Sequence, residues 1–380
     1  MDATADAVEG AAEAEARVLD GRAWSDFCDA LKLAGDAVSR PGSPQDAFDR
    51  AEGYRYISRL VRVALESYIE FADPAAPVLR RPAHETVKIG ADNPDNHYQS
   101  AAISGQYEYR IRGQRGSVYY LGLGTYAGNY GSDERRGQTG YIEASDLEID
   151  SEGRFEIQVS CRRPASGKNW LPMERDTSSL IVRQTYQDRR LEQIADLNLE
   201  RIGGSGPPAP LTPLALDSGL AAAAAYVRGT ANLFCEWSEG FRGELNALPV
   251  FDPAVARAAH GDPHIQYYHG YWELGPDEAL LIEVKPPVCE YWNFQLNNHW
   301  MESLDYRYHR IDLNHHAAVQ AADGTVRLIV AHKDPGLPNW LDTASHRRGT
   351  MCLRWIRAQT HPQPVTRVLP LADLVAESAG

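Results

Sequence analysis

The stretch NWLPMERDTSSLIVRQ at residues 169–184 returns in altered form as NWLDTASHRRGTMCLRW at residues 339–355. Both begin with Asn-Trp-Leu and both end next to an arginine, Arg183 in the first and Arg354 in the second, 171 positions apart. A pair of aromatic residues and an acidic residue–glycine turn followed by FEIQVS or VRLIVA precede both stretches at nearly the same spacing. Such landmarks in one order indicate an internal duplication, and two copies make a tandem pair rather than a solenoid.

The duplicated regions have the pattern of short strands. From about residue 84, β-branched and aromatic segments alternate with Gly, Asp, Asn and Pro: QYEYRIRG, SVYYLGLGTYAG, DLEID, RFEIQVSC and SLIVRQTY. This spacing is typical of sandwiches and barrels. We therefore predict a mainly β fold of two tandem jelly-roll-like β-sandwiches, at 83–202 and 251–380.

Two other regions are expected to be helical. Apolar residues recur at three- and four-residue steps before residue 70, as one helical stripe: Ile57, Leu60, Val61, Ala64, Leu65 and Tyr68. Residues 1–82 are therefore predicted as an N-terminal helical region. The Gly/Pro/Ser-rich run GGSGPPAPLTP leads into LDSGLAAAAAYVRGTANLFCEW, so 203–250 is predicted as a linker and a bridging helix.

The composition bounds the class of protein. The 380 residues exceed one typical core, and the net charge of −14 disfavours nucleic acid or an anionic membrane as partner. No apolar run is long enough to span a membrane, and the acidic, alanine-rich start is unlike a secretory signal. Five scattered cysteines without a CxxC pair do not suggest a disulfide framework. We expect a cytoplasmic protein, and leave a homo-oligomer open.

Residues that both copies share are expected to do the same structural work. The Asn-Trp-Leu corner would close a turn through the asparagine side chain and bury the indole at the end of a sandwich. Arg183 and Arg354 would anchor carbonyls or carboxylates within the protein. An arginine fork also suits the carboxylate of a ligand, so a binding role for them stays open.

Residues that differ between the copies are the candidates for chemistry. His332, Asp334 and Asp342 stand where the first copy has Cys161, Arg163 and Pro172. With His346 they form the predicted catalytic set, His332, Asp334, Asp342 and His346, because a histidine beside a carboxylate is suited to general acid–base catalysis. This hypothesis requires them to converge on one cavity with Arg354. The alternative is a solvated network on surface loops.

Substrate-binding residues are expected around CEYWNFQLNNHW at 289–300. Alternation along a strand would place Tyr291, Asn293, Gln295 and Asn297 on one face and Trp292, Phe294 and Leu296 on the other. Amides beside aromatic rings suit polyhydroxylated ligands, although a solvated sheet face would show the same pattern. The predicted binding residues are Trp292, Asn297, His299, Trp300, Asn339, Trp340 and Arg354.

Other motifs are weak. GLGTYAG at 122–128 lacks the following helix that a dinucleotide fingerprint requires, and no phosphate loop or nucleophile elbow appears. The His315-His316 region fits no zinc spacing, although a loop metal stays open. We therefore predict no cofactor and no metal.

Five segments together resemble the bacterial domain-of-unknown-function family 1214: AEGYRYISRLVRVALE, KIGADNPDNHYQSAAISGQYEYRIRG, GKNWLPMERDTSSLIVRQTY, EYWNFQLNNHWMESLDY and HKDPGLPNWLDTASHRRGTMCLRW. The resemblance covers essentially the whole chain after about residue 20. It implies jelly-roll sandwiches, a fold that in related proteins has been likened to glycan amidases. Fold alone does not imply function.

The sequence favours a cofactor-independent enzyme, a hydrolase or lyase acting on a polar or glycosylated small molecule through the His/carboxylate set. Two alternatives stay open: a non-catalytic carbohydrate- or lipid-binding module, and an accessory or scaffold protein. An enzyme would hold a histidine–carboxylate pair inside a pocket, whereas a binding module would show an aromatic groove without one.

Overall fold

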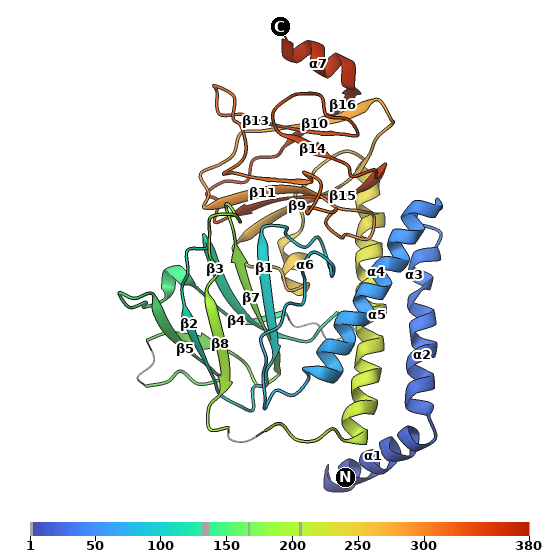
Figure 1. Cartoon of the computed structure of the whole chain (residues 1–380), viewed down its shortest axis with the longest axis vertical. Helices are drawn as coiled ribbons and strands as arrows, with labels where there is room; N and C mark the ends of the chain where they lie inside the picture. Colours follow the sequence, from blue (N-terminus) through green and yellow to red (C-terminus); the bar gives the residue numbers. More distant parts are fainter. Residues whose placement is uncertain (1–2, 131–136, 166–167, 205–206, 380) are drawn as a thin grey trace.

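Two β-sandwiches lie one above the other, with a group of helices along one side (Figure 1). The computed structural model describes residues 3–130, 137–165, 168–204 and 207–379. The N-terminus lies with the helices, and the C-terminal helix caps the far end of the second sandwich (Figure 1).

Within the described residues, the first sandwich has eight strands in two four-stranded sheets. One sheet has the order β1-β7-β3-β4 and the other β6-β5-β2-β8. The strands are β1 (Asn96–Ala102), β2 (Tyr109–Gln114), β3 (Tyr120–Ala127), β4 (Gly137–Glu143), β5 (Arg154–Ser160), β6 (Trp170–Pro172), β7 (Thr177–Thr185) and β8 (Asp196–Arg201).

The second sandwich repeats this design. Its sheets have the orders β9-β15-β11-β12 and β14-β13-β10-β16, which match those of the first strand by strand. The strands are β9 (Ile265–Glu273), β10 (Glu278–Val284), β11 (Tyr291–Leu296), β12 (Asp312–Asn314), β13 (Val326–Ala331), β14 (Trp340–Asp342), β15 (Arg348–Ile356) and β16 (Val365–Pro370). The predicted mainly β fold with an internal duplication is confirmed.

The matched register also fixes which residues correspond. Ser160 pairs with Pro172 between β5 and β6, and Ala331 pairs with Asp342 between β13 and β14, in parallel in both copies. The predicted equivalence of Pro172 and Asp342 is therefore confirmed.

Each sandwich has its own core, which follows from alternation along the strands. On β7, Leu180 and Val182 enter the first core, while Ile181 and Arg183 face the other way. On β11, Trp292 and Phe294 share a face, as the sequence predicted, and both enter the second core. The outward face of each of these two sheets is left to be covered by something else.

The N-terminal helices and the bridging helix pack around a third core, which joins them to the second sandwich through Trp300. They are α1 (Ala3–Leu19), α2 (Arg22–Ala34), α3 (Asp36–Ser39), α4 (Ala47–Leu65), the π-helical turn η1 (Glu66–Glu70) and the bridging helix α5 (Pro213–Phe241). Outside this core lie α6 (Pro253–Ala258), α7 (Leu371–Ala379) and the short 3₁₀ turns η2 (Ala144–Asp146) and η3 (Arg242–Glu244). Helix α5 runs beside both sandwiches (Figure 1), so the predicted bridging helix is confirmed. Within the described ranges, none of these helices is long and apolar enough to cross a membrane.

One predicted strand is wrong. The segment DLEID at 146–150 forms the end of η2 and a turn rather than a strand. Leu147 and Ile149 are half-buried against the first core, which satisfies their alternation without a neighbouring strand to pair with.

Candidate functional site

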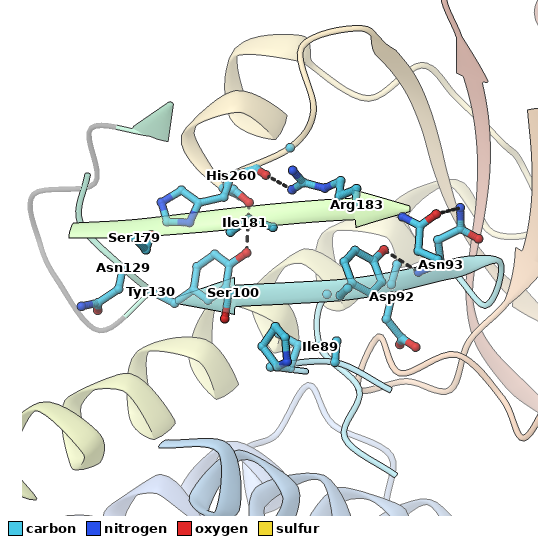
Figure 2. Close-up of a pocket in the computed structure, with 18 of the residues that line it drawn as sticks. Ile89, Asp92, Asn93, Ser100, Asn129, Tyr130, Ser179, Ile181, Arg183 and His260 are labelled. Carbon is cyan, nitrogen blue, oxygen red and sulfur yellow. Dashed lines mark hydrogen bonds between the residues drawn. The ribbon is translucent and has the colours of Figure 1, made fainter. Parts of the chain in front are cut away.

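A cavity of about 340 Å³ lies between the two sandwiches, within the usual volume range of small-molecule sites. Its floor is the outward face of β1 and β7, and one wall comes from β9 and from Arg354 of β15. Helix α5 and the loop before β9 close it from the other sides, with Phe234, Trp237 and His260 among the lining residues. Figure 2 shows Arg183 and Ile181 on β7, with Tyr130 reaching across from the loop after β3.

The lining is positively charged although the chain as a whole is acidic, with a net charge of −14. Three arginines line the cavity, Arg80, Arg183 and Arg354, against one carboxyl side chain among the described residues, Asp92. Burial raises the pKa of Asp92, an effect that the nearby Lys88 opposes. The cavity is therefore an environment that favours a negative charge.

Arg183 and Arg354 hold the two sandwiches together reciprocally. The Nη2 of Arg183 donates to the carbonyl of His260 at 2.6 Å, which belongs to the loop that precedes β9. The Nη2 of Arg354 donates to the carbonyl of Ala91, in the loop that precedes β1. Ala91 and His260 lie 169 positions apart and both have left-handed backbones, with φ of 57° and 61°. The contact is thus the same in both directions, as at a two-fold interface between identical subunits.

The remaining acceptors of the two guanidinium groups are neutral. Arg183 Nη1 donates to the hydroxyl of Tyr126 at 2.8 Å, and Arg354 Nη1 donates to Gln295 Oε1 at 2.6 Å. Arg354 is only 4% exposed. Asp262 lies near Arg183, but its oxygens accept from tyrosine hydroxyls and from a backbone N–H. Both cations are therefore enclosed without a carboxylate bonded to them in the described residues, which is uncommon for buried charges.

Two tyrosines accompany these arginines at equivalent positions. Tyr98 pairs with Arg183 between β1 and β7, and Tyr267 pairs with Arg354 between β9 and β15. Each hydroxyl accepts the backbone N–H of the residue five positions earlier, Asn93 at 3.0 Å and Asp262 at 3.3 Å. Because these bonds use the oxygens as acceptors, each O–H remains a donor. Each of the two tyrosine hydroxyls interacts electrostatically with both arginines, so the four side chains form one cluster of hydrogen-bond donors.

The Asp262 carboxylate breaks the symmetry, since the equivalent residue is Asn93. Its Oδ2 accepts from Tyr141 at 2.8 Å and from Tyr120 at 3.2 Å, and Tyr120 and Tyr141 also contact each other through their hydroxyls. Burial, together with Asp262, raises the pKa of Tyr120 above its usual value, so its phenol stays protonated. Tyr120 lines the cavity, so the hydrogen-bond network around Asp262 extends to the cavity wall.

His269 lies in the same wall, stacked on Phe241 with ring centroids 5.3 Å apart. Burial and the neighbouring Arg354 lower its pKa to about 3, so the imidazole is neutral. No group of three or more His, Cys, Asp or Glu side chains that could hold a metal ion occurs within the described ranges.

Both repeats match a known family. The model of a family described as a protein of unknown function (DUF1214) matches residues 95–187 and 278–360, which are segments of the two repeats. A crystal structure of an uncharacterised protein from Burkholderia cenocepacia is 51% identical over 94% of this chain and 99% of that chain, with a TM-score of 0.92. The chain belongs to the DUF1214 family.

Two further comparisons add nothing on function to the DUF1214 assignment. The VPA0106 protein from Vibrio parahaemolyticus covers 90% of this chain and 100% of its own at 13% identity and a TM-score of 0.46, which is too low to support an argument. A search of curated proteins found no match.

In this DUF1214 protein, Arg354 alone among the predicted site residues lines the cavity. His332 bonds to the Thr343 hydroxyl at 2.8 Å, and His346 bonds to the carbonyls of Thr343 and Ala344. Asp342 pairs instead with His309 at 2.7 Å. The predicted catalytic set is therefore not assembled around Arg354.

Asp334 completes that set and accepts the backbone N–H of Gly336 in an exposed turn. Asn339 and Trp340 occupy the repeated corner: Asn339 bonds both the N–H and the carbonyl of Val319, and the Trp340 indole donates to the carbonyl of Ala331. Asn169 and Trp170 make the corresponding bonds in the first copy. Their shared structural work is what the duplication predicted.

The amide-rich face of β11 exists but is fully covered. Asn293 donates to Asn93 Oδ1 and Gln295 to the carbonyl of Asp92, both at 2.8 Å. Asn297 bonds to Gln295 and to Thr350, and Trp292 lies in the core on the other face. The amides thus fasten the loop before β1, which places Ala91 within reach of Arg354.

Trp300 forms a socket for helix α4, and His299 packs against the Trp300 ring. The Trp300 indole donates to the carbonyl of Asp49 at 2.9 Å, and its ring presses on Gly53. His299 bonds to the Tyr271 hydroxyl at 2.9 Å, and burial lowers its pKa to about 3. These residues are buried within the protein rather than turned to the cavity.

Sequence reasoning missed Tyr98, Tyr267, Tyr120 and Arg80. The first two carried a usable signal, since they lie 169 positions apart and so belong to the duplication. Tyr120 belongs to the pair of aromatic residues that helped to align the two copies. Nothing in its local pattern distinguished Arg80.

Proposed function

We propose that this protein binds a small organic anion in the cavity between its two repeats, with Arg183 and Arg354 holding the anionic group. The observation that carries the proposal is the pair of enclosed guanidinium groups whose bonded acceptors are all neutral. A carboxylate is the natural counter-charge for an arginine fork.

The physical gain from such a ligand is large because the cations are already desolvated. Folding has removed water from Arg354 and has supplied only carbonyl oxygens in return. A carboxylate between the arginines would also accept the O–H donors of Tyr98 and Tyr267. Charge-assisted hydrogen bonds are roughly twice as strong as neutral ones.

The rest of the lining suits an apolar body. Ile181, Ile265 and Phe234 contribute aliphatic and aromatic surface, as do Trp237 and Phe251. Pockets of this kind combine an apolar wall with a few convergent polar groups. The proposed ligand is therefore a carboxylate with an aliphatic or aromatic body.

We also propose that the protein is located in the cytoplasm, which its five free cysteines support.

The experiment is calorimetric titration with matched pairs of charged and neutral compounds: hexanoate against hexanamide, and benzoate against benzamide. We expect the acids to bind and the amides to bind about tenfold or more weakly, because a hydrogen-bonded charge contributes about 1.5–3 kcal/mol. Arg354→Gln should reduce the difference in affinity between acid and amide.

The control must be destabilised without touching the cavity, because Arg354 also braces the repeats. Asn169→Ala meets this need, since Asn169 closes a corner of the first sandwich away from the lining. It should keep the preference for the acid. Equal binding of acid and amide, or an unchanged preference in Arg354→Gln, would overturn the proposal.

A second candidate is an enzyme of the hydrolase or lyase type acting on the same ligand. It is favoured by Tyr120, whose protonated hydroxyl lines the cavity and bonds to the Asp262 carboxylate, an arrangement suited to proton transfer. This moves the proposed acid–base group from the C-terminal corner to the first repeat. We expect the wild-type protein to form product from a bound acid, and Tyr120→Phe to lose this turnover while it still binds the acid. Unchanged turnover in Tyr120→Phe would contradict the second candidate.

A further inference from the structure

The cavity has a second cationic end, formed by Arg80. The backbone N–H and carbonyl of Arg80 pair with those of Ser100 at 2.9 and 2.8 Å, which adds Arg80 to the open edge of β1. Directly opposed residues of an antiparallel pair share a face. The Arg80 side chain therefore lies on the face of Ser100, which is the floor of the cavity.

The Arg80 end and the Arg183 end of the cavity lie in neighbouring rows of side chains on the same face of the sheet. Ser100 pairs with Ile181, whereas Tyr98 pairs with Arg183 two residues away along the strand. With about 3.4 Å per residue and about 4.8 Å between strands, the backbones of Arg80 and Arg183 lie on the order of 12 Å apart. Ile181 lies in the row of Arg80 and Ser100, two residues from Arg183 along β7, and faces the cavity (Figure 2), so an apolar side chain lies beside the path between the two cationic ends.

Arg80 also lacks a bonded carboxylate in the described part of the chain. Its Nη2 donates to the Ser67 hydroxyl, while its Nη1 is buried without a hydrogen-bond partner. A buried N–H of a charged group without an acceptor costs free energy that a ligand oxygen would recover. Ser67, Tyr68 and Tyr226 surround this end and offer hydroxyl groups.

We propose that the ligand carries two acidic groups, one held by Arg183 and Arg354 and the other by Arg80, with an aliphatic segment lying over Ile181. This rests on the proposed anion-binding function and names its substrate class as dicarboxylates of intermediate length. A monocarboxylate would satisfy one end and leave the Arg80 Nη1 unpaired.

The test compares dicarboxylates with monocarboxylates of equal carbon number by calorimetric titration of the full chain: glutarate, adipate and pimelate against pentanoate, hexanoate and heptanoate. We expect the best diacid to bind about tenfold to a hundredfold more tightly than its matched monoacid, which is the usual contribution of one added charged hydrogen bond. Arg80→Gln should reduce the affinity for the diacid to that for the monoacid.

Arg81→Gln is the matched control, since Arg81 is the exposed neighbour that pairs with Glu85 and does not line the cavity. It should leave both affinities unchanged. Diacids no tighter than monoacids, or a diacid preference that persists in Arg80→Gln, would overturn this inference while anion binding stands. Binding of neither class would instead overturn the proposed function itself.

Discussion

A single imidazole illustrates how the cavity wall is built at the residue scale. His269 lies between the rings of Phe241 and Tyr267, 5% exposed and beside Arg354, and its pKa is lowered to about 3. Below about pH 6.5, His269 is therefore protonated in the unfolded chain while it stays neutral in the folded protein. The contribution of His269 to the free energy of unfolding is therefore fully present above about pH 6.5 and is lost as the pH falls toward 3.

This linkage gives a prediction for His269→Gln. Between pH 6 and pH 4, the variant's free energy of unfolding should depend less steeply on pH, by about 1.4 kcal/mol per pH unit. Denaturant unfolding at several pH values measures the slope. An unchanged slope in His269→Gln would show instead that His269 takes up its proton in the folded protein as readily as in the unfolded chain.

At the scale of elements, the docking of α4 depends on one close approach. Gly53 faces the Trp300 ring so closely that a Cβ there would lie 2.5 Å from Trp300 Cζ2 and 2.8 Å from Val38 Cγ1. Trp300 is fully buried and its indole is bonded to Asp49. Neither ring nor helix can move without breaking that bond, and next to it Arg59 pairs with the buried Glu302 at 2.6 Å.

We therefore expect Gly53→Ala to lower the free energy of unfolding by about 1–3 kcal/mol, the usual cost of overpacking. Gly240→Ala is the matched control, because Gly240 is an exposed helical glycine with no heavy atom within 4 Å of the position that a Cβ would take. Alanine there should stabilise by up to about 1 kcal/mol through helix propensity. Thermal unfolding followed by circular dichroism separates the two, and equal midpoints would contradict the tight contact between α4 and its socket.

The sequence predicted the secondary-structure elements better than it predicted the site. Alternation on β7 and β11 and the repeated Asn-Trp-Leu corner follow from local rules, and the duplication cross-checks them. DLEID shows the limit, because Leu147 and Ile149 alternate correctly yet have no partner strand. A period of two shows which side chains are buried but does not show that a ladder forms.

At the scale of the whole molecule, the two repeats form a fused pair with a cavity between them. Arg183 reaches His260 and Arg354 reaches Ala91, so each repeat completes the other. The sequence identified both arginines through the duplication, and it identified the amide face of β11. It could not show that this face fastens the loop before β1, because that contact joins segments about 200 residues apart.

The same reason explains why the predicted catalytic histidines lie elsewhere. Differences between the copies directed attention to His332 and His346, whereas the cavity uses what the copies share and adds helix α5 and Arg80 from outside the repeats. Asymmetry between copies marks local chemistry. Arg183 and Arg354 at the junction of the repeats are equivalent residues, which comparison of the copies classified as framework.

The most direct measurement is a crystal structure of the full chain with 6-bromohexanoate, whose bromine can be located by anomalous scattering. We expect one bromine peak inside the cavity and carboxylate oxygens within hydrogen-bonding distance of Arg354 or Arg183 and of a hydroxyl of Tyr98 or Tyr267. A bound acid located elsewhere, with the cavity free of it, would contradict the claim that the junction of the repeats is an anion-binding site.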